Sequence, residues 1–293
     1  MKKGCENIMF ILDLNQVMIS NLMMQIRNHT NIDIKVEQLR AMVLNTIRSL
    51  NVKFRDEYGE FIIACDNKNS WRRQIFPYYK ANRKRDREKS ELDWEKIFEA
   101  LSTIRSELKE NFPYRVIDVE TAEADDIIAT LVKEYATSNP EEKILILSRD
   151  KDFIQLHIYD NVVQFDPISK MYVKNNTPEL FIKQHIITGD STDGIPNILS
   201  SDNCFVIGER QKRMTSKRLE YFINYNPEEY NDEMCKRNYY RNQYLIDFNY
   251  IPSEISATIL QEYNNQANKT RSKMFNYFVK QRLPLLMESI NQF

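Results

Sequence analysis

The first two-thirds of the chain alternates short apolar segments with longer amphipathic ones, and this alternation constrains the fold most strongly. Five short apolar segments have the length and residue types of buried strands, at 8–12, 61–65, 114–117, 143–147 and 162–165. Helical patterns lie between them at 36–54, 92–111 and 122–135. Strands separated by helices are typical of βαβ units, so we expect an α/β fold with a mainly parallel central sheet flanked by helices.

Beyond about residue 176 the strand pattern stops. The sequence then predicts helices rich in Tyr, Asn and charged residues at 227–248, 253–263 and 273–280. We therefore expect an α/β domain over residues 1–180 and a smaller helical region over 181–293 that packs against it. The uncharged run at 14–26 is too short to cross a bilayer and no secretory signal is visible, so we expect no membrane association. Four cysteines without a C-x-x-C pair (Cys5, Cys65, Cys204, Cys235) indicate reduced thiols in a cytosolic chain.

Acidic side chains follow the ends of the predicted strands. Asp13 closes the first strand, Asp66 the second, and Asp150 and Asp152 follow the fourth. Because ligands bind beyond the carboxyl ends of parallel strands, these residues are site candidates. Five more acidic residues start a predicted helix or lie in a turn with Gly and Pro: Glu123, Asp125, Asp126, Asp190 and Asp193. Each residue alone is explained as well by loop or helix capping, but nine negative charges at one edge would repel each other unless cations lay among them.

The residue types indicate which cation these carboxylates would bind. Carboxylate oxygens suit hard divalent ions, and Mg²⁺ fits best. The three histidines, His29, His157 and His185, have no metal-binding spacing, which argues against zinc. We expect His157 to be a loop or core residue.

Basic residues are concentrated in two runs. Residues 68–89 contain nine basic and two acidic side chains, interleaved with Trp71, Phe76, Tyr78 and Tyr79. A second run at 210–218 is opposed only by Glu209. Either run alone could be a solvated surface, but basic residues interleaved with rings also suit a phosphate backbone and unpaired bases. The net charge is only −1, yet the molecule is strongly positive once the nine clustered carboxylates are set aside, so we predict a polyanionic partner.

These acidic and basic motifs together resemble the flap endonuclease/5′ nuclease superfamily, in particular its T-even phage ribonuclease H branch. The resemblance covers nearly the whole chain, up to a similar closing run at 278–293. It rests on the strand-end acids and on three motifs, Glu123-Ala-Asp125-Asp126, Asp150-x-Asp152-Phe153 and Gly189-Asp190-x-x-Asp193-x-Ile195-Pro196. The segments 71–73 and 78–83 are similar to the arch that gates the active site in this superfamily, here at about 67–90.

The resemblance implies a Mg²⁺-dependent 5′→3′ nuclease whose catalytic domain is residues 1–180 and whose DNA-binding region is residues 181–293. It implies two-metal hydrolysis of RNA–DNA hybrids (primer removal), duplex DNA and 5′ flaps or forks, with Mn²⁺ able to replace Mg²⁺. The first ion is expected near Asp13, Asp66, Glu123, Asp125, Asp150 and Asp152. The second is expected near Asp126, Asp190 and Asp193, or bound to them through water molecules. Lys80, aided by Arg83, is expected to reach the scissile phosphate. The expected nucleic-acid contacts are Arg72, Arg73, Lys80, Arg83, Lys84, Arg85, Lys212 and Arg213.

The chain departs from the superfamily after Pro196, where other members have a Gly-rich helical hairpin that grips duplex DNA. Residues 197–204 here read Asn-Ile-Leu-Ser-Ser-Asp-Asn-Cys, so the sequence does not predict that grip or a monovalent ion held in it. The expected partners are DNA and RNA–DNA hybrids, with a single-strand-binding protein or a sliding clamp as further candidates. We expect a monomer, in the host cytoplasm if the gene belongs to a phage.

Three other functions compete with this prediction. A haloacid-dehalogenase-type phosphatase would need an acid two residues after Asp13, where Asn15 stands. A PIN-type ribonuclease would not require the basic arch or the helical last third. A catalytically silent nucleic-acid-binding replication factor would gain nothing from nine carboxylates beside a phosphate chain.

Overall fold

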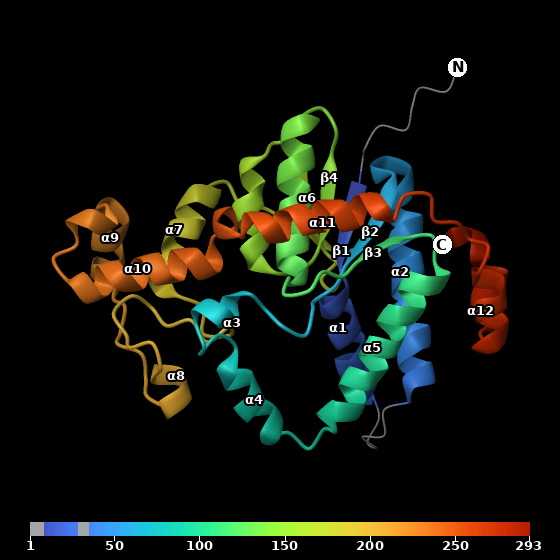
Figure 1. The fold of residues 1–293 in the computed structure, drawn as a ribbon, viewed down its shortest axis with the longest axis horizontal. Coiled ribbons are helices and arrows are strands. Elements are labelled where there is room, and N and C mark those ends of the chain that lie inside the picture. Colours follow the sequence, from blue (N-terminus) through green and yellow to red (C-terminus); the bar gives the residue numbers. More distant parts are fainter. Residues whose placement is uncertain (1–8, 29–34) are drawn as a thin grey trace.

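The computed structural model describes residues 9–28 and 35–293, and it confirms the expected fold class. A six-stranded sheet has the order β3-β2-β1-β4-β5-β6, with β1 to β5 parallel and β6 antiparallel to β5 (Figure 1). The strands are β1 (Met9–Asp13), β2 (Glu60–Ala64), β3 (Arg115–Ile117), β4 (Ile144–Leu147), β5 (Val162–Asp166) and β6 (Met171–Val173). The sequence predicted the first five; residue 8, the expected start of the first strand, lies outside the described residues. The short edge strand β6 was not predicted, because its three side chains are at least partly exposed and leave no hydrophobic run.

The order of the strands creates a crevice at one edge of the sheet. From β1 the chain adds β2 and then β3 on one side, and returns to place β4 on the other side of β1. This reversal is a topological switch point, where loops beyond adjacent strands diverge and leave room for a ligand. Asp13 is the last residue of β1 and therefore stands at this point.

Three long helices and the end of the chain cover one face of the sheet. The helices α1 (Leu14–Asn28), α2 (Val36–Tyr58) and α5 (Trp94–Asn111) pack their apolar sides against β1 and β2. In α2 the buried residues Val43, Ile47, Leu50 and Phe54 recur at helical spacing, and the helix ends at Gly59 with φ 66°. The short helices α12 (Met274–Lys280) and α13 (Pro284–Glu288) join the same core.

The opposite face is covered by α6 (Ala124–Ser138), α11 (Ser253–Asn265) and the 3₁₀ segment η1 (Lys151–Ile158). Figure 1 shows α11 lying across the sheet beside α6. Residues 253–293 therefore return to the sheet and bury side chains on both faces.

A third group of helices gathers beside the sheet and builds its own small core. It consists of α7 (Pro178–Thr188), α9 (Ser216–Asn224) and α10 (Glu233–Ile246) (Figure 1). The remaining helical elements are short: α3 (Arg72–Ile75), α4 (Ala81–Glu88), α8 (Cys204–Ile207), η2 (Pro227–Glu229), η3 (Phe248–Tyr250) and η4 (Ile290–Gln292). The domain boundary near residue 180 stays a prediction.

Two simpler expectations concern membranes and thiols. No helix in the described ranges has both the length and the apolar character needed to cross a membrane. Cys65, Cys204 and Cys235 are buried and free, whereas Cys5 lies outside the described residues.

Candidate active site

Four carboxylates converge beyond the carboxyl ends of β1, β2 and β4. Asp13 ends β1, Asp66 lies two residues after β2, Asp150 caps η1 after β4, and Asp125 lies in the first turn of α6. Backbone and polar side chains orient the first two. Asp66 accepts hydrogen bonds from the Ala124 amide (2.7 Å) and the Asn15 side chain (2.5 Å), and Asp13 accepts one from the Gln16 amide (3.1 Å).

The pKa values of these four side chains are all raised, which shows that little positive charge lies near them. Burial, reinforced by the charge of Asp66, raises the pKa of Asp13 to about 7. Burial and the neighbouring Asp152 raise the pKa of Asp150 to about 6, and burial with Asp150 and Asp13 raises the pKa of Asp125 well above its usual range. Burial also raises the pKa of Asp66, although Lys80 opposes it. Folding has thus brought together acids that repel one another.

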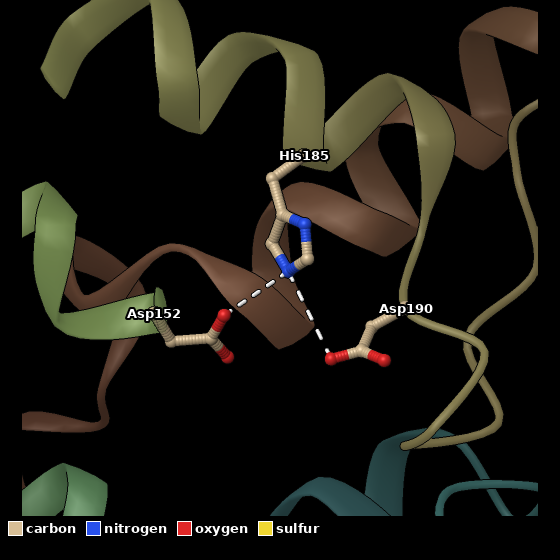
Figure 2. A group of neighbouring side chains, drawn as sticks. All are labelled: Asp152, His185 and Asp190. Atoms are coloured by element: carbon tan, nitrogen blue, oxygen red, sulfur yellow. Dashed lines mark ion pairs between the residues drawn. The ribbon is translucent and has the colours of Figure 1, made fainter. Parts of the chain in front are cut away.

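A second acidic group lies beside the first and includes a histidine that the sequence did not indicate. His185, in the last turn of α7, places its Nε2 3.2 Å from Asp152 Oδ1 and 3.9 Å from Asp190 Oδ2 (Figure 2). Burial lowers the pKa of His185, but the two carboxylates outweigh it and raise the pKa above its ordinary value. Sequence spacing could not reveal this group, because Asp152 is 33 positions from His185.

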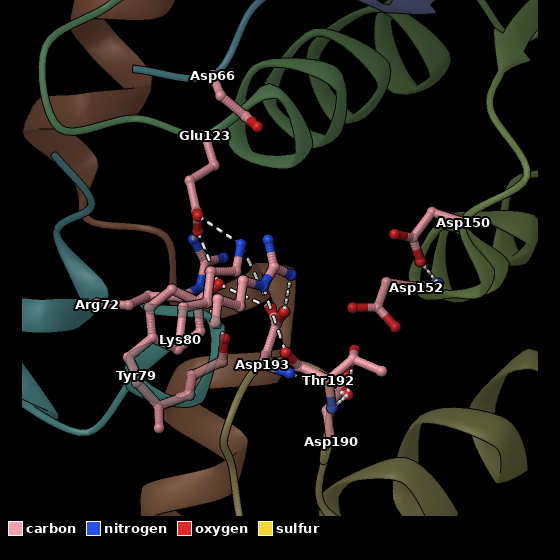
Figure 3. A network of polar contacts seen from close by, with 12 residues as sticks. Asp66, Arg72, Tyr79, Lys80, Glu123, Asp150, Asp152, Asp190, Thr192 and Asp193 are labelled. Carbon is pink, nitrogen blue, oxygen red and sulfur yellow. Dashed lines mark hydrogen bonds and ion pairs between the residues drawn. The ribbon is translucent and has the colours of Figure 1, made fainter. Parts of the chain in front are cut away.

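Three other predicted acids are neutralised by basic side chains of the arch segment (Figure 3). Lys80 Nζ lies 2.6 Å from Glu123 Oε1 and 3.4 Å from Asp193 Oδ2. Arg72 donates to Glu123 Oε2 at 3.1 Å. It also lies 2.8 Å from Asp126 Oδ1 and donates to Asp126 Oδ2 at 3.0 Å. Burial would raise the pKa of Glu123, but the charges of Lys80 and Arg72 outweigh it and lower the pKa to about 2.

The backbone of Lys80 is held in an unusual conformation that aims its side chain at these acids. Its φ is 55°, in the left-handed region that costs free energy for a residue with a Cβ. The Lys80 amide donates to the Asp193 carbonyl at 2.7 Å, which ties this conformation to the 190–195 turn. Gly194 packs against the arch with φ 72°, where an added Cβ would lie 3.0 Å from the Tyr78 carbonyl. The arch and the acidic turn are therefore fitted to each other.

Two residues of the predicted site are bonded to protein partners in the structure. Arg72 was expected on the nucleic-acid surface, but it is 3% exposed and its guanidinium is occupied by Glu123, Asp126 and the Leu245 carbonyl. Asp126 was expected near the second ion, but it is fully buried and accepts hydrogen bonds from the Trp71 indole and the Glu123 amide as well as from Arg72. Both residues instead join the arch to the start of α6.

The predicted stacking rings are also mostly internal. Trp71 and Tyr79 are each 3% exposed, and the Tyr79 hydroxyl donates to Glu123 at 2.8 Å and to Asp193 at 2.9 Å. Neither ring is free to stack on a base in this conformation, while Tyr78 is half-buried. Helical amphipathicity could not show this, since the rings lie in loops and short turns around α3.

The other predicted basic contacts lie on the surface. The exposed set comprises Arg73, Arg83, Lys84, Arg85, Lys212 and Arg213. Arg83 also pairs with Asp193, and Arg85 donates to the Phe205 carbonyl at 3.2 Å, which brings the arch beside α8. The arch thus contacts α8, which precedes the second basic run in the chain.

Two asparagine side chains of α10 donate hydrogen bonds to the backbone around residues 197–204, the segment where other members of the superfamily have the helical hairpin. Asn238 donates to the carbonyls of Ile198 and Ser200, and Asn242 donates to those of Ile186 and Pro196, all at 2.8–2.9 Å. Because both asparagines are fully buried, these bonds fix the path of residues 196–200.

Comparison with known proteins identifies the family. The model described as the N-terminal resolvase-like domain of 5′-3′ exonucleases matches residues 9–186, and the model of the C-terminal domain of T4 RNase H matches residues 176–293. The chain belongs to the 5′-3′ exonuclease family. It is a 5′ nuclease and therefore a hydrolase.

Individual relatives agree with this assignment. The chain is 37% identical over 295 residues to Ribonuclease H of Enterobacteria phage T4, covering 97% of this chain and 95% of the relative. It is 34% identical over 139 residues to flap endonuclease Xni of Shewanella sp. (strain MR-4), covering 44% and 48% of the two chains. The flap endonuclease of bacteriophage T5, solved with DNA and metal ions, has the same fold, with a TM-score of 0.62 at 18% identity over 88% of this chain and 98% of that chain.

The buried ion pairs of Arg72 generate a stability prediction. Arg72→Met leaves Glu123 and Asp126 without their shared cation, so we expect the free energy of unfolding in urea to fall by about 3–5 kcal/mol. The matched variant Arg73→Met, at an exposed neighbouring position, should change it by less than about 0.5 kcal/mol. Equal effects of the two substitutions would show that Arg72 is not the structural cation described here.

The repulsion at the strand ends generates a prediction for metal-free protein. When folding raises the pKa of an acid, ionisation of that acid destabilises the folded state. The destabilisation grows as the pH rises from the pKa in the unfolded protein, about 3.9, to the pKa in the folded protein. With Asp13 at about 7 and Asp150 at about 6, the melting temperature in EDTA should fall between pH 5 and pH 8. Mg²⁺ should therefore raise the melting temperature more at pH 8 than at pH 5.

The control for that measurement is a substitution at the same sheet edge. Asp13→Asn should raise the melting temperature in EDTA at pH 8 and reduce the Mg²⁺ response, whereas the exposed Asp160→Asn should do neither. A Mg²⁺ response that is the same at both pH values and in both variants would contradict the description of the acids as a mutually repelling group.

Proposed function

We propose that this 5′ nuclease depends on two divalent cations, Mg²⁺ with Mn²⁺ as a substitute, bound by the carboxylates at the β1/β4 switch point. The observation that carries the proposal is the uncompensated state of Asp13, Asp66, Asp125 and Asp150. Basic side chains of the arch balance Glu123, Asp126 and Asp193, but none pairs with these four within the described residues. A divalent ion supplies the missing positive charge.

The side chains present fit hard cations. All four are carboxylates, the ligand type that Mg²⁺ prefers, and each oxygen of Asp13 and Asp66 accepts one hydrogen bond and keeps a second lone pair for a cation. They would hold one ion, and Asp152 with Asp190 would hold the other beside it. When bound, such ions lower the pKa of an attacking water and stabilise charge that develops on the phosphate.

Lys80 and Arg83 supply fixed positive charge beside that position. Lys80 is only 12% exposed and lies between Glu123 and Asp193, so a scissile phosphate placed there would meet its ammonium group with little intervening water. A preorganised charge of this kind contributes a factor of about 10²–10³ in rate at other sites. Arg83 reaches the same turn from the exposed side of α4.

The nucleic acid would approach over the two basic runs. Arg73, Lys84 and Arg85 extend from the arch, and Lys212 and Arg213 extend from the segment before α9. Beside the second run a surface pocket of about 570 Å³ is lined by Lys212, Lys217 and Arg218 with aromatic side chains beneath. Basic groups along such a path bind the phosphate backbone without reading sequence.

The similarity to a phage ribonuclease H and to flap endonucleases supports particular substrates. We propose that the enzyme removes RNA primers from RNA–DNA hybrids and also cleaves duplex DNA and 5′ flaps or forks. A single-strand-binding protein or a sliding clamp would be the expected protein partners during replication.

Substitution of a strand-end acid tests this function. Wild-type protein should release short 5′ products from labelled RNA–DNA hybrid, nicked duplex and 5′-flap substrates in Mg²⁺ but not in EDTA. Asp150→Asn should slow cleavage at least about 100-fold, because a carboxylate of the proposed ion site is lost, while duplex binding in a mobility-shift assay persists. Asp160→Asn, the same chemical change on the exposed surface, should cleave at the wild-type rate.

Two outcomes would overturn the proposal. Cleavage by wild type in EDTA would remove the metal dependence, and wild-type turnover by Asp150→Asn would remove the strand-end acids from the reaction. Substrate that is shifted but intact under every condition would favour the silent binder.

A further inference from the structure

His185 enters the crevice from a different element than the acids around it. It lies on α7, Asp152 on η1 and Asp190 in the turn after α7, and one ligand atom from each lies within 4.8 Å of the others (Figure 2). The three side chains are each 17–20% exposed, so the cluster is largely enclosed but open to a solvent ion.

The imidazole ring of His185 is held in place by packing, while its Nε2 atom faces the carboxylates without an aligned hydrogen bond. The ring stacks on Phe181 one helical turn earlier, with ring centres 5.7 Å apart and an interplanar angle of 15°. Nε2 is buried and makes no aligned hydrogen bond, although Asp152 Oδ1 is 3.2 Å away. A buried nitrogen without a hydrogen bond is costly unless another partner occupies its lone pair or proton.

Asp190 is held so that one of its oxygens faces the histidine. Asp190 Oδ1 accepts hydrogen bonds from the Thr192 amide and hydroxyl at 2.7 and 2.6 Å, which leaves Oδ2 facing His185. The turn depends on Gly189, whose φ is 67° and whose absent Cβ would lie 2.4 Å from the Ile195 carbonyl. The backbone thus presents Asp190 to the imidazole in one orientation.

We propose that His185 is a nitrogen ligand of the second cation site, with Asp152 and Asp190, and that it makes this site prefer Mn²⁺ or a similar first-row transition ion over Mg²⁺. The inference rests on the proposed metal-dependent nuclease and adds a ligand and a metal preference to it. It applies to one site only, because the strand-end site around Asp13 has carboxylate ligands alone.

The chemistry of the donor atoms supports a difference between the two sites. Mn²⁺ and Mg²⁺ both bind carboxylate, carbonyl and water oxygens, but imidazole nitrogen is a ligand of first-row transition ions and a poor one for Mg²⁺, so the nitrogen is what would separate the two metals. Two carboxylates and one imidazole leave several coordination positions for water or phosphate oxygens. The competing explanation is that His185 is a plain counter-ion of Asp152 and Asp190 and never binds metal.

Electron spin-echo spectroscopy of Mn²⁺ distinguishes a coordinated imidazole from a nearby counter-ion. The full chain is loaded with two equivalents of Mn²⁺, once unlabelled and once with ¹⁵N-histidine. We expect ¹⁴N modulation typical of a directly bound imidazole, replaced by ¹⁵N features on labelling. Bound Mn²⁺ without a histidine nitrogen signal would overturn the proposal, and this test needs no variant.

Calorimetry gives an independent measure of the metal preference. His185→Leu, or His185→Gln if the first fails to fold, should weaken Mn²⁺ binding at one of two sites at least about ten-fold, since even supporting residues of metal sites contribute that much. Mg²⁺ binding should change far less. His157→Leu is the matched control, because His157 bonds to Gln164 through Nε2 and does not belong to the cluster. Equal weakening of both metals, or none, would contradict the proposal.

These results separate the inference from the function on which it rests. If Mn²⁺ binds without imidazole while cleavage still requires divalent metal and Asp150, only the role of His185 fails. If cleavage needs no metal, the proposed function fails as well.

Discussion

Repulsion among buried carboxylates at one edge of a parallel sheet is the interaction on which the rest of this structure depends. The sheet topology forces the ends of β1, β2 and β4 together, and each ends in or near an acid. Part of the charge is neutralised within the chain, by Arg72, Lys80 and Arg83 of the arch. Burial, together with the remaining negative charge of Asp66, raises the pKa of Asp13 to about 7, and the proposed cations would supply the missing positive charge.

This division of charge links the arch to the site. Lys80 and Arg72 hold Glu123 and Asp126 at the start of α6, and Asp193 pairs with both Lys80 and Arg83. A cation bound at the proposed site would interact with the same negative charge, which would couple the position of the arch to the occupancy of the site. The strained backbone of Lys80 is maintained by the same contacts.

The sequence predicted the sheet and its acidic edge because both follow from local patterns. Strand-length apolar runs and helical spacing identify β1, β2 and α2, and parallel strands place their final residues at one edge. Local patterns could not predict which basic side chains of residues 68–89 are buried, since charge counts do not show which side chains turn inward. Arg72 and Arg73 are adjacent, yet one is buried against two acids and the other is exposed. The pairing of His185 with Asp152 was not predicted for a related reason, because the tertiary packing of η1 against α7 brings the two side chains together.

Anomalous diffraction from crystals soaked in Mn²⁺ tests most directly whether cations lie among these carboxylates. We expect two anomalous peaks, one enclosed by Asp13, Asp66, Asp125 and Asp150, and one between Asp152, His185 and Asp190. An absence of peaks among well-ordered side chains, with the carboxylates protonated or paired only with protein groups, would contradict the claim that cations hold this edge of the sheet together.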